Sequence, residues 1–226
     1  MPISSNRRNL VLRAFIVAAA TMFPMASFAA TIVSTFDSDA DGWTGIPNEG
    51  AVAFVASGGN PGGHIRVTDI GTGGPLGSGA VAPAKFLGDL SALKDGTLSL
   101  DMATFGGSLG GTFPIFGTVR ILGGGDSALF DLATTAPPLN VWQMFSAPLT
   151  AAAWGKTDAE WMAILASVTE IAISTDAFNG GDIIGIDNFQ LASPSQTVSV
   201  PLPGSGGLFV VGLAGLAASM RGGRQH

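Results

Sequence analysis

The sequence predicts an all-β domain, a β-sandwich of jelly-roll type with one short helix, flanked by an apolar segment at each end. Residues 97–102 alternate with period two and place Leu98, Leu100 and Met102 on one face, which is typical of a half-buried strand. The 33 glycines and 13 prolines cluster between such segments. This distribution indicates a fold with many turns.

The alternating segments predict about nine short strands, which is enough for two packed sheets. In chain order they cover residues 31–36, 51–55, 65–68, 97–102, 115–122, 128–132, 141–149, 168–174 and 183–191. The expected helix begins with a capping box, Thr157-Asp158-Ala159-Glu160, and continues with Trp161, Ile164 and Leu165 at helical spacing.

Residues 1–29 have the three regions of a secretory signal peptide. Three arginines precede an apolar run from Ala14 to Ala20, and small residues follow at Ser27 and Ala29. We therefore expect cleavage between Ala29 and Ala30. The chain has no cysteine, so an exported domain cannot be held by disulfides and must rely on its core or on a metal.

The last 27 residues carry a proline-containing signature, then an apolar run from Gly204 to Met220, then a basic end. The signature is Val200, Pro201, Leu202 and Pro203, and the basic end contains Arg221 and Arg224. The run is short for a membrane helix, which needs about 20 apolar residues, and the arginines would keep the C-terminus inside.

This tail resembles a PEP-CTERM sorting signal of the variant that begins Val-Pro-Leu-Pro. The resemblance implies a transient anchor in the inner membrane and processing by exosortase. A plain C-terminal membrane anchor is the alternative. Between the two ends we expect one domain, residues 30–191, followed by a linker at residues 192–199 and the sorting segment at residues 200–226.

Charge argues against nucleic acid as a partner. Five of the ten basic residues lie in the two end segments, which leaves five against all sixteen acidic residues in between. A domain with a formal charge of −11 lacks the basic surface that phosphate backbones require.

The domain also resembles a laminin B (laminin IV type A) domain. The resemblance is carried by residues 59–69 and 81–90, by Phe36-Asp37 and Gly42-Trp43, and by residues 96–100 and 185–191. It implies a galactose-binding-like jelly roll, an architecture shared with many carbohydrate-binding modules, and no catalytic residues. The chain has His64 where that family often has an aromatic residue, and it has no tyrosine.

One acidic segment is a candidate calcium site. Asp37, Asp39 and Asp41 are spaced two apart, so their side chains could converge on one hard cation. Asp187 is the best additional ligand, because the final strand could pair beside the first. The alternative is an acidic turn without metal.

Four tryptophans could stack on sugar rings. Trp43, Trp142 and Trp161 are expected inside the domain, whereas Trp154 beside Gly155 is the best candidate for an exposed ring that stacks on a ligand; a core position is the alternative. Catalysis by a serine relay would need His64, the single histidine of the domain.

These features predict an exported, non-catalytic protein of the cell surface or extracellular matrix that binds exopolysaccharide, for example in a biofilm. Two alternatives remain open at this point. One is a structural surface-coat protein without a glycan ligand, and the other is a secreted hydrolase that acts on glycans.

Overall fold

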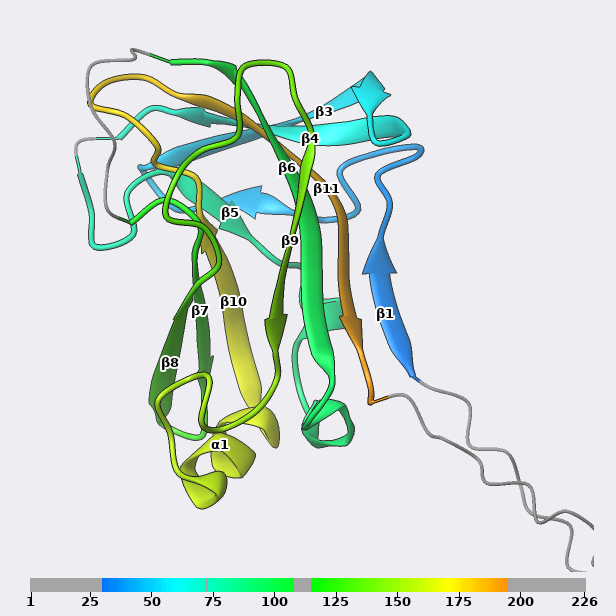
Figure 1. Cartoon of the computed structure of the whole chain (residues 1–226), viewed down its shortest axis with the longest axis vertical. Coiled ribbons are helices and arrows are strands. Elements are labelled where there is room, and N and C mark those ends of the chain that lie inside the picture. Colours follow the sequence, from blue (N-terminus) through cyan, green and yellow to red (C-terminus); the bar gives the residue numbers. More distant parts are fainter. Residues whose placement is uncertain (1–29, 72, 108–114, 195–226) are drawn as a thin grey trace, which may run out of the picture.

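Two antiparallel β-sheets face each other in the computed structural model, which describes residues 30–71, 73–107 and 115–194 (Figure 1). The six-stranded sheet has the order β3 (Gly50–Gly59), β4 (Gly62–Asp69), β11 (Ile183–Ala192), β6 (Thr97–Gly106) and β9 (Gln143–Pro148), with β1 (Thr31–Ser34) also paired to β11. The five-stranded sheet has the order β2 (Thr44–Gly45), β5 (Gly79–Val81), β10 (Val168–Ser174), β7 (Thr118–Gly123) and β8 (Asp126–Asp131).

Strand β11 organises the six-stranded sheet. One side of β11 pairs with β6 along most of its length. On the other side its first half, Ile183 to Ile186, pairs with β4, and its second half, Phe189 to Ala192, pairs with β1. The two residues between these halves, Asp187 and Asn188, therefore lie opposite the junction of β1 and β4.

Alternation along the strands divides the six-stranded sheet into a core face and an outer face. Ile65 and Val67 of β4 and Ile184 and Ile186 of β11 are at most 1% exposed and lie in the core. They pack with residues of the five-stranded sheet such as Ile121. The intervening side chains of the same strands point to the outer face.

Helix α1 (Asp158–Leu165) begins with the predicted capping box. The Thr157 hydroxyl accepts a hydrogen bond from the Glu160 amide at 3.3 Å, and the Glu160 carboxylate accepts one from the Thr157 amide at 2.8 Å. The helix buries Trp161, Ile164 and Leu165, as expected from their spacing. Figure 1 shows that α1 closes one end of the domain, beside β7 and β8.

The structure confirms the all-β prediction and the single short helix, to which it adds two 3₁₀ turns, η1 (Ala84–Phe86) and η2 (Ser91–Leu93). The described residues form eleven strands, and each of the nine predicted segments overlaps one of them. The sequence missed β2 and β5, because strands of two and three residues are too short to show an alternating pattern.

The two ends of the domain lie side by side. Thr31 pairs with Ala192, and the Ser193 amide donates a hydrogen bond to the Ala30 carbonyl at 2.8 Å. The predicted signal peptide up to Ala29, residues 195–199 of the linker and the sorting signal from Val200 to Pro203 with Arg221 and Arg224 lie outside the described residues. Within the described part of the chain, no helix has the length and apolarity to cross a membrane.

Candidate functional site

An aromatic platform lies on the outer face of the six-stranded sheet and consists of His64 of β4, Phe105 of β6 and Trp142, which precedes β9. The His64 and Phe105 rings are stacked with centroids 5.0 Å apart. The Trp142 ring meets both edge-on, at 5.4 Å from His64 and 5.7 Å from Phe105. His64 is buried, whereas Phe105 and Trp142 are half-buried and remain partly accessible.

A polar contact and a cation hold the platform in place. The Trp142 indole Nε1 donates a hydrogen bond to the Gly58 carbonyl at 2.9 Å, which ties it to β3. The Arg66 guanidinium lies 5.5 Å from the centre of the Phe105 ring, a geometry that favours cation–π attraction. Burial and the nearby charge of Arg66 lower the pKa of His64, so the imidazole is neutral at neutral pH.

The platform depends on a glycine beneath it. A Cβ atom at Gly185 of β11 would lie 2.5 Å from Cε2 of Phe105, 2.8 Å from Cη2 of Trp142 and 3.2 Å from Cδ2 of His64. Because carbon atoms in contact are normally 3.5–4.0 Å apart, only glycine lets all three rings meet at this point of the sheet.

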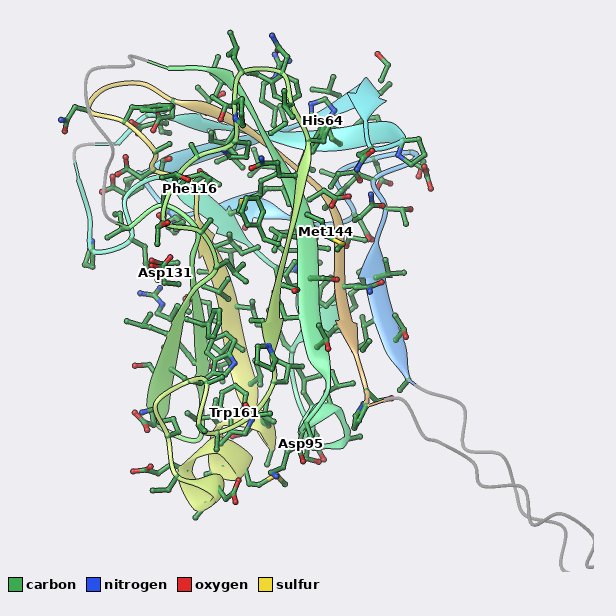
Figure 2. All side chains as sticks on the ribbon, in the orientation of Figure 1. His64, Asp95, Phe116, Asp131, Met144 and Trp161 are labelled. Atoms are coloured by element: carbon green, nitrogen blue, oxygen red, sulfur yellow. The ribbon has the colours of Figure 1, made fainter. Side chains whose placement is uncertain are left out.

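A polar hollow of about 300 Å³ lies farther along the same face. It is lined by Ser99 and Asp101 of β6, Asn188 and Gln190 of β11, and the apolar side chains of Val33 and Met144. Met144 is 75% exposed. Figure 2 shows His64 near the end of the domain where β4 runs and Met144 toward the middle of the sheet.

The turn between β3 and β4 fills the junction opposite Asp187 and Asn188. The Asn60 amide donates to Asp187 Oδ2 at 2.6 Å, and the Asn60 carbonyl accepts from Asn188 Nδ2 at 2.5 Å. Asp101 Oδ2 accepts from both side-chain amides, at 3.1 Å from Asn60 and 2.8 Å from Asn188. These hydrogen bonds hold Asp101 and Asn188, which line the polar hollow, in place on the sheet.

Asp187 is fully buried in this network. Burial raises its pKa, two backbone amides oppose that rise, and the charges of Asp101 and Asp37 add to it. A Cβ at Gly59 would lie 2.7 Å from Asp187 Oδ2, and one at Gly62 would lie 3.0 Å from Asp37 Oδ1. The Gly-rich turn therefore passes close to both carboxylates.

The structure does not gather the four predicted calcium ligands into one group. Within the described ranges, one set of three or more acidic or histidine side chains has ligand atoms within 4.8 Å of one another, and it contains none of Asp37, Asp39, Asp41 and Asp187. Asp41 instead forms an ion pair with Lys85.

The carboxylate of Asp41 is engaged by other protein groups, Ser34 and Lys85. Burial favours its neutral form, but hydrogen bonds from Lys85 and Ser34 together hold the pKa of Asp41 below its usual value. Asp39 Oδ1 accepts the Asp41 amide at 2.7 Å, so it acts as a turn residue. Asp37, Asp39 and Asp41 nevertheless line one hollow of about 370 Å³, and Asp187 is not among its lining residues.

Two of the tryptophan predictions are wrong. Trp154 is 3% exposed, stacks on Trp161 with centroids 5.2 Å apart and donates to the Pro148 carbonyl at 2.9 Å. It is a core residue, because its turn folds back onto α1. Trp142, expected in the core, lies on the outer face, whereas Trp43 and Trp161 are buried as predicted.

The sequence analysis missed Phe105 as a site residue. A signal for it was present, because the alternation that buries Leu98, Leu100 and Met102 places Phe105 on the opposite face of β6. Its partners could not be read from the chain, since contact with His64 depends on the register of β6, β11 and β4. None of the hydrogen bonds among the described residues joins His64 to a serine hydroxyl and a carboxylate, as a serine relay needs.

The chain matches no known family profile and no curated protein sequence. Among solved structures it is similar to the L4b domain of human laminin α-2, with a TM-score of 0.46 and 12% identity over 57% of this chain and 80% of that one. It is also similar to the CBM22-1 xylan-binding domain of Paenibacillus barcinonensis Xyn10C, with a TM-score of 0.45 and 12% identity over 73% and 95% of the two chains.

A third similar structure is the CBM22-1 and GH10 part of Clostridium thermocellum xylanase 10B, solved with xylohexaose. The TM-score is 0.47 and the identity 17%, over 76% of this chain and 30% of that one, so the chain spans under a third of that enzyme.

We expect Gly185→Ala to lower the free energy of unfolding by about 1–3 kcal/mol, because the added methyl group overpacks the three rings. Urea denaturation followed by tryptophan fluorescence measures this change. Gly106→Ala is the matched control, since its Cβ would have its nearest neighbour, Ile183 Cδ1, at an ordinary 3.4 Å. Equal stability of the two variants would contradict the close packing of the platform.

Proposed function

We propose that the domain binds a neutral polysaccharide along the outer face of the six-stranded sheet. The observation that carries this proposal is the alignment of the aromatic platform with the polar hollow on one continuous face. Ligand sites for sugars need both parts, since ring faces pack on aromatic side chains and hydroxyl groups need hydrogen-bond partners.

The two parts have complementary chemistry. Trp142 and Phe105 supply apolar area with little conformational entropy to lose, because they are already fixed by packing and by the bond to Gly58. In the hollow, Ser99, Asp101 and Gln190 supply hydroxyl, carboxylate and amide groups for sugar hydroxyls.

The spacing of the two parts favours an oligosaccharide over a single sugar. Asp101 and Phe105 lie four residues apart on the same face of β6, which corresponds to about 13 Å. A single sugar ring is shorter than this distance, so one ligand that contacts both parts must contain several linked units.

Charge favours a neutral glycan. Asp101 lines the hollow, and the segment between the two end regions carries five basic against sixteen acidic residues. A polyanionic glycan would be repelled by these carboxylates at low ionic strength.

Trp142→Ala is expected to weaken polysaccharide binding about tenfold or more, because truncating a central aromatic contact costs about 1.4 kcal/mol or more. Binding of the purified chain to a panel of neutral and acidic polysaccharides, by isothermal titration or affinity electrophoresis, measures the effect. Leu129→Ala serves as the control, since Leu129 is a 54% exposed apolar residue on β8 of the other sheet.

Three outcomes would count against this proposal. Equal losses for Trp142→Ala and Leu129→Ala would mean that the platform is not the binding surface. No binding to any polysaccharide would favour a structural surface-coat protein, which would self-associate instead. Turnover of a bound polysaccharide would favour a glycan-active hydrolase.

We also propose that the protein is exported through the inner membrane, processed by exosortase and delivered to the cell surface. The tripartite order of the C-terminal segment and the signal-peptide pattern before Ala30 support this proposal. It is also compatible with the structure, because the two ends of the described domain, Ala30 and Ser193, lie side by side.

Replacement of Val200 to Pro203 by alanines is expected to leave a larger, membrane-associated form of the protein in cells. Fractionation and immunoblotting with and without the sorting enzyme measure both size and location. Identical size and location in all samples would contradict processing, and a membrane-bound wild type in each sample would favour the plain anchor.

We propose that a structural calcium ion binds near Asp37 and Asp187, where the turn of Asn60 meets the first and last strands. Asp37→Asn should then reduce the calcium-dependent rise in melting temperature, because it removes one anionic ligand from an exposed position. Asp126→Asn, which changes a carboxylate on β8 of the other sheet, is the control. A melting temperature that does not respond to chelator in the wild type would contradict this proposal.

A further inference from the structure

Three carboxylates from separate segments meet at the end of the six-stranded sheet where β4 ends and β11 begins. Asp69 is the last residue of β4, Asp176 follows β10 and Asp182 precedes β11. One ligand oxygen of each lies within 4.8 Å of the others. We call this group the acidic cluster, and it is distinct from the platform and from Asp187.

The acidic cluster is largely shielded from water. Asp176 is 6% exposed and Asp182 is 1% exposed, while Asp69 is half-buried. The Asp69 amide donates to the Asp182 carbonyl at 2.9 Å, so the backbone itself holds two of the three carboxylates together. Residues of like charge are rarely buried side by side without a compensating partner.

Protein groups compensate this charge only in part. Asp69 Oδ1 accepts the Gly71 amide, and Asp182 Oδ2 accepts the amides of Ala177 and Phe178 at 2.7 and 2.9 Å. None of the ion pairs formed by the described residues includes a member of the cluster.

One buried oxygen in the acidic cluster has no partner at all among the described residues. Oδ1 of Asp182 accepts no hydrogen bond there, although Asp182 is almost completely buried. Leaving a buried carboxylate oxygen unsatisfied is costly. A cation bound between the three carboxylates would give this oxygen a partner.

Burial and neighbouring charges oppose the ionised form of Asp176, whereas a hydrogen bond from the Ser78 backbone favours it. Burial, then the charge of Asp69, then the charge of Asp182 raise the pKa of Asp176 to about 6, and Glu49 adds to the rise. Unfolding would return this carboxyl to its ordinary value of 3.8. Without a cation, stability therefore falls as the pH rises from about 4 to about 6, and the full penalty remains at neutral pH.

The surroundings suit a hard cation. A solvent-open hollow of about 490 Å³ is lined by Asp69, Asp176 and the loop residues Gly71, Asn179 and Gly181. Backbone carbonyls, side-chain oxygens and water can complete the six to eight oxygen ligands that Ca²⁺ takes. The cluster has no histidine or cysteine to favour zinc or copper.

We propose that Asp69, Asp176 and Asp182 together bind a divalent cation, with Ca²⁺ as the preferred ion. The ion neutralises three crowded carboxylates, supplies Oδ1 of Asp182 with a partner and fastens the segment between β10 and β11 to the end of β4. Its role is to stabilise the fold, and it does not depend on the function proposed for the platform.

Asp176→Asn separates this proposal from a purely acidic cluster, because its effect has opposite signs with and without the ion. In excess chelator at pH 7 the variant should melt at or above the wild-type temperature, since one repelling charge is gone. With calcium at a hundred-fold excess over its dissociation constant, the wild type should gain about 5 °C or more, and the variant should lose that gain.

Equilibrium dialysis with calcium alone on the full chain counts the ions. The Asp176→Asn variant should bind one ion fewer than the wild type, whereas Asp126→Asn, an exposed carboxylate far from the cluster in the chain, should bind the same number. Asp37→Asn tests the other calcium proposal and should leave the ion at the acidic cluster. Asp69→Asn provides a second variant in case Asp176→Asn does not fold.

Two results would overturn the proposal. One is a wild type whose melting temperature is the same in chelator and in calcium. The other is an Asp176→Asn or Asp69→Asn variant that folds and keeps both the full calcium-dependent shift and the wild-type number of bound ions.

Discussion

The position of Asp187 in β11 is the constraint on which the rest of the domain depends. Its carboxylate is fully buried, and it accepts the backbone amides of Asn60 and Asn188 at 2.6 and 2.7 Å. At this point β11 changes partner from β4 to β1. The turn of Asn60 closes the resulting junction, so one carboxylate connects the β3–β4 turn to the last strand.

The same junction determines where the polar hollow and the aromatic platform lie on the outer face. Because Asn60 and Asn188 converge on Asp101, the polar hollow is held rigidly at the centre of the sheet. Two residues before Asp187, Gly185 leaves room for the aromatic platform. The polar and apolar parts of the proposed glycan site are therefore neighbours along β11, and a shift in its register would move both.

Local patterns in the sequence were enough to predict nine of the eleven described strands, the capping box of α1 and the burial of Trp43 and Trp161. Features that depend on distant contacts were missed or wrong. Trp154 lies beside Gly155, which is typical of an exposed turn, yet this turn packs the Trp154 ring on Trp161. The acidic cluster joins Asp69 to Asp182 across more than a hundred residues, and no spacing rule connects such positions.

The most direct test of the glycan-binding face uses the four tryptophan indole N–H signals of the domain in a nuclear magnetic resonance titration with a neutral oligosaccharide. Trp142 lies on the outer face, whereas Trp43, Trp154 and Trp161 are at most 3% exposed. We predict that the Trp142 signal shifts saturably while the other three change little. Saturable shifts that spare Trp142, or a complete absence of shifts, would contradict binding at the aromatic platform.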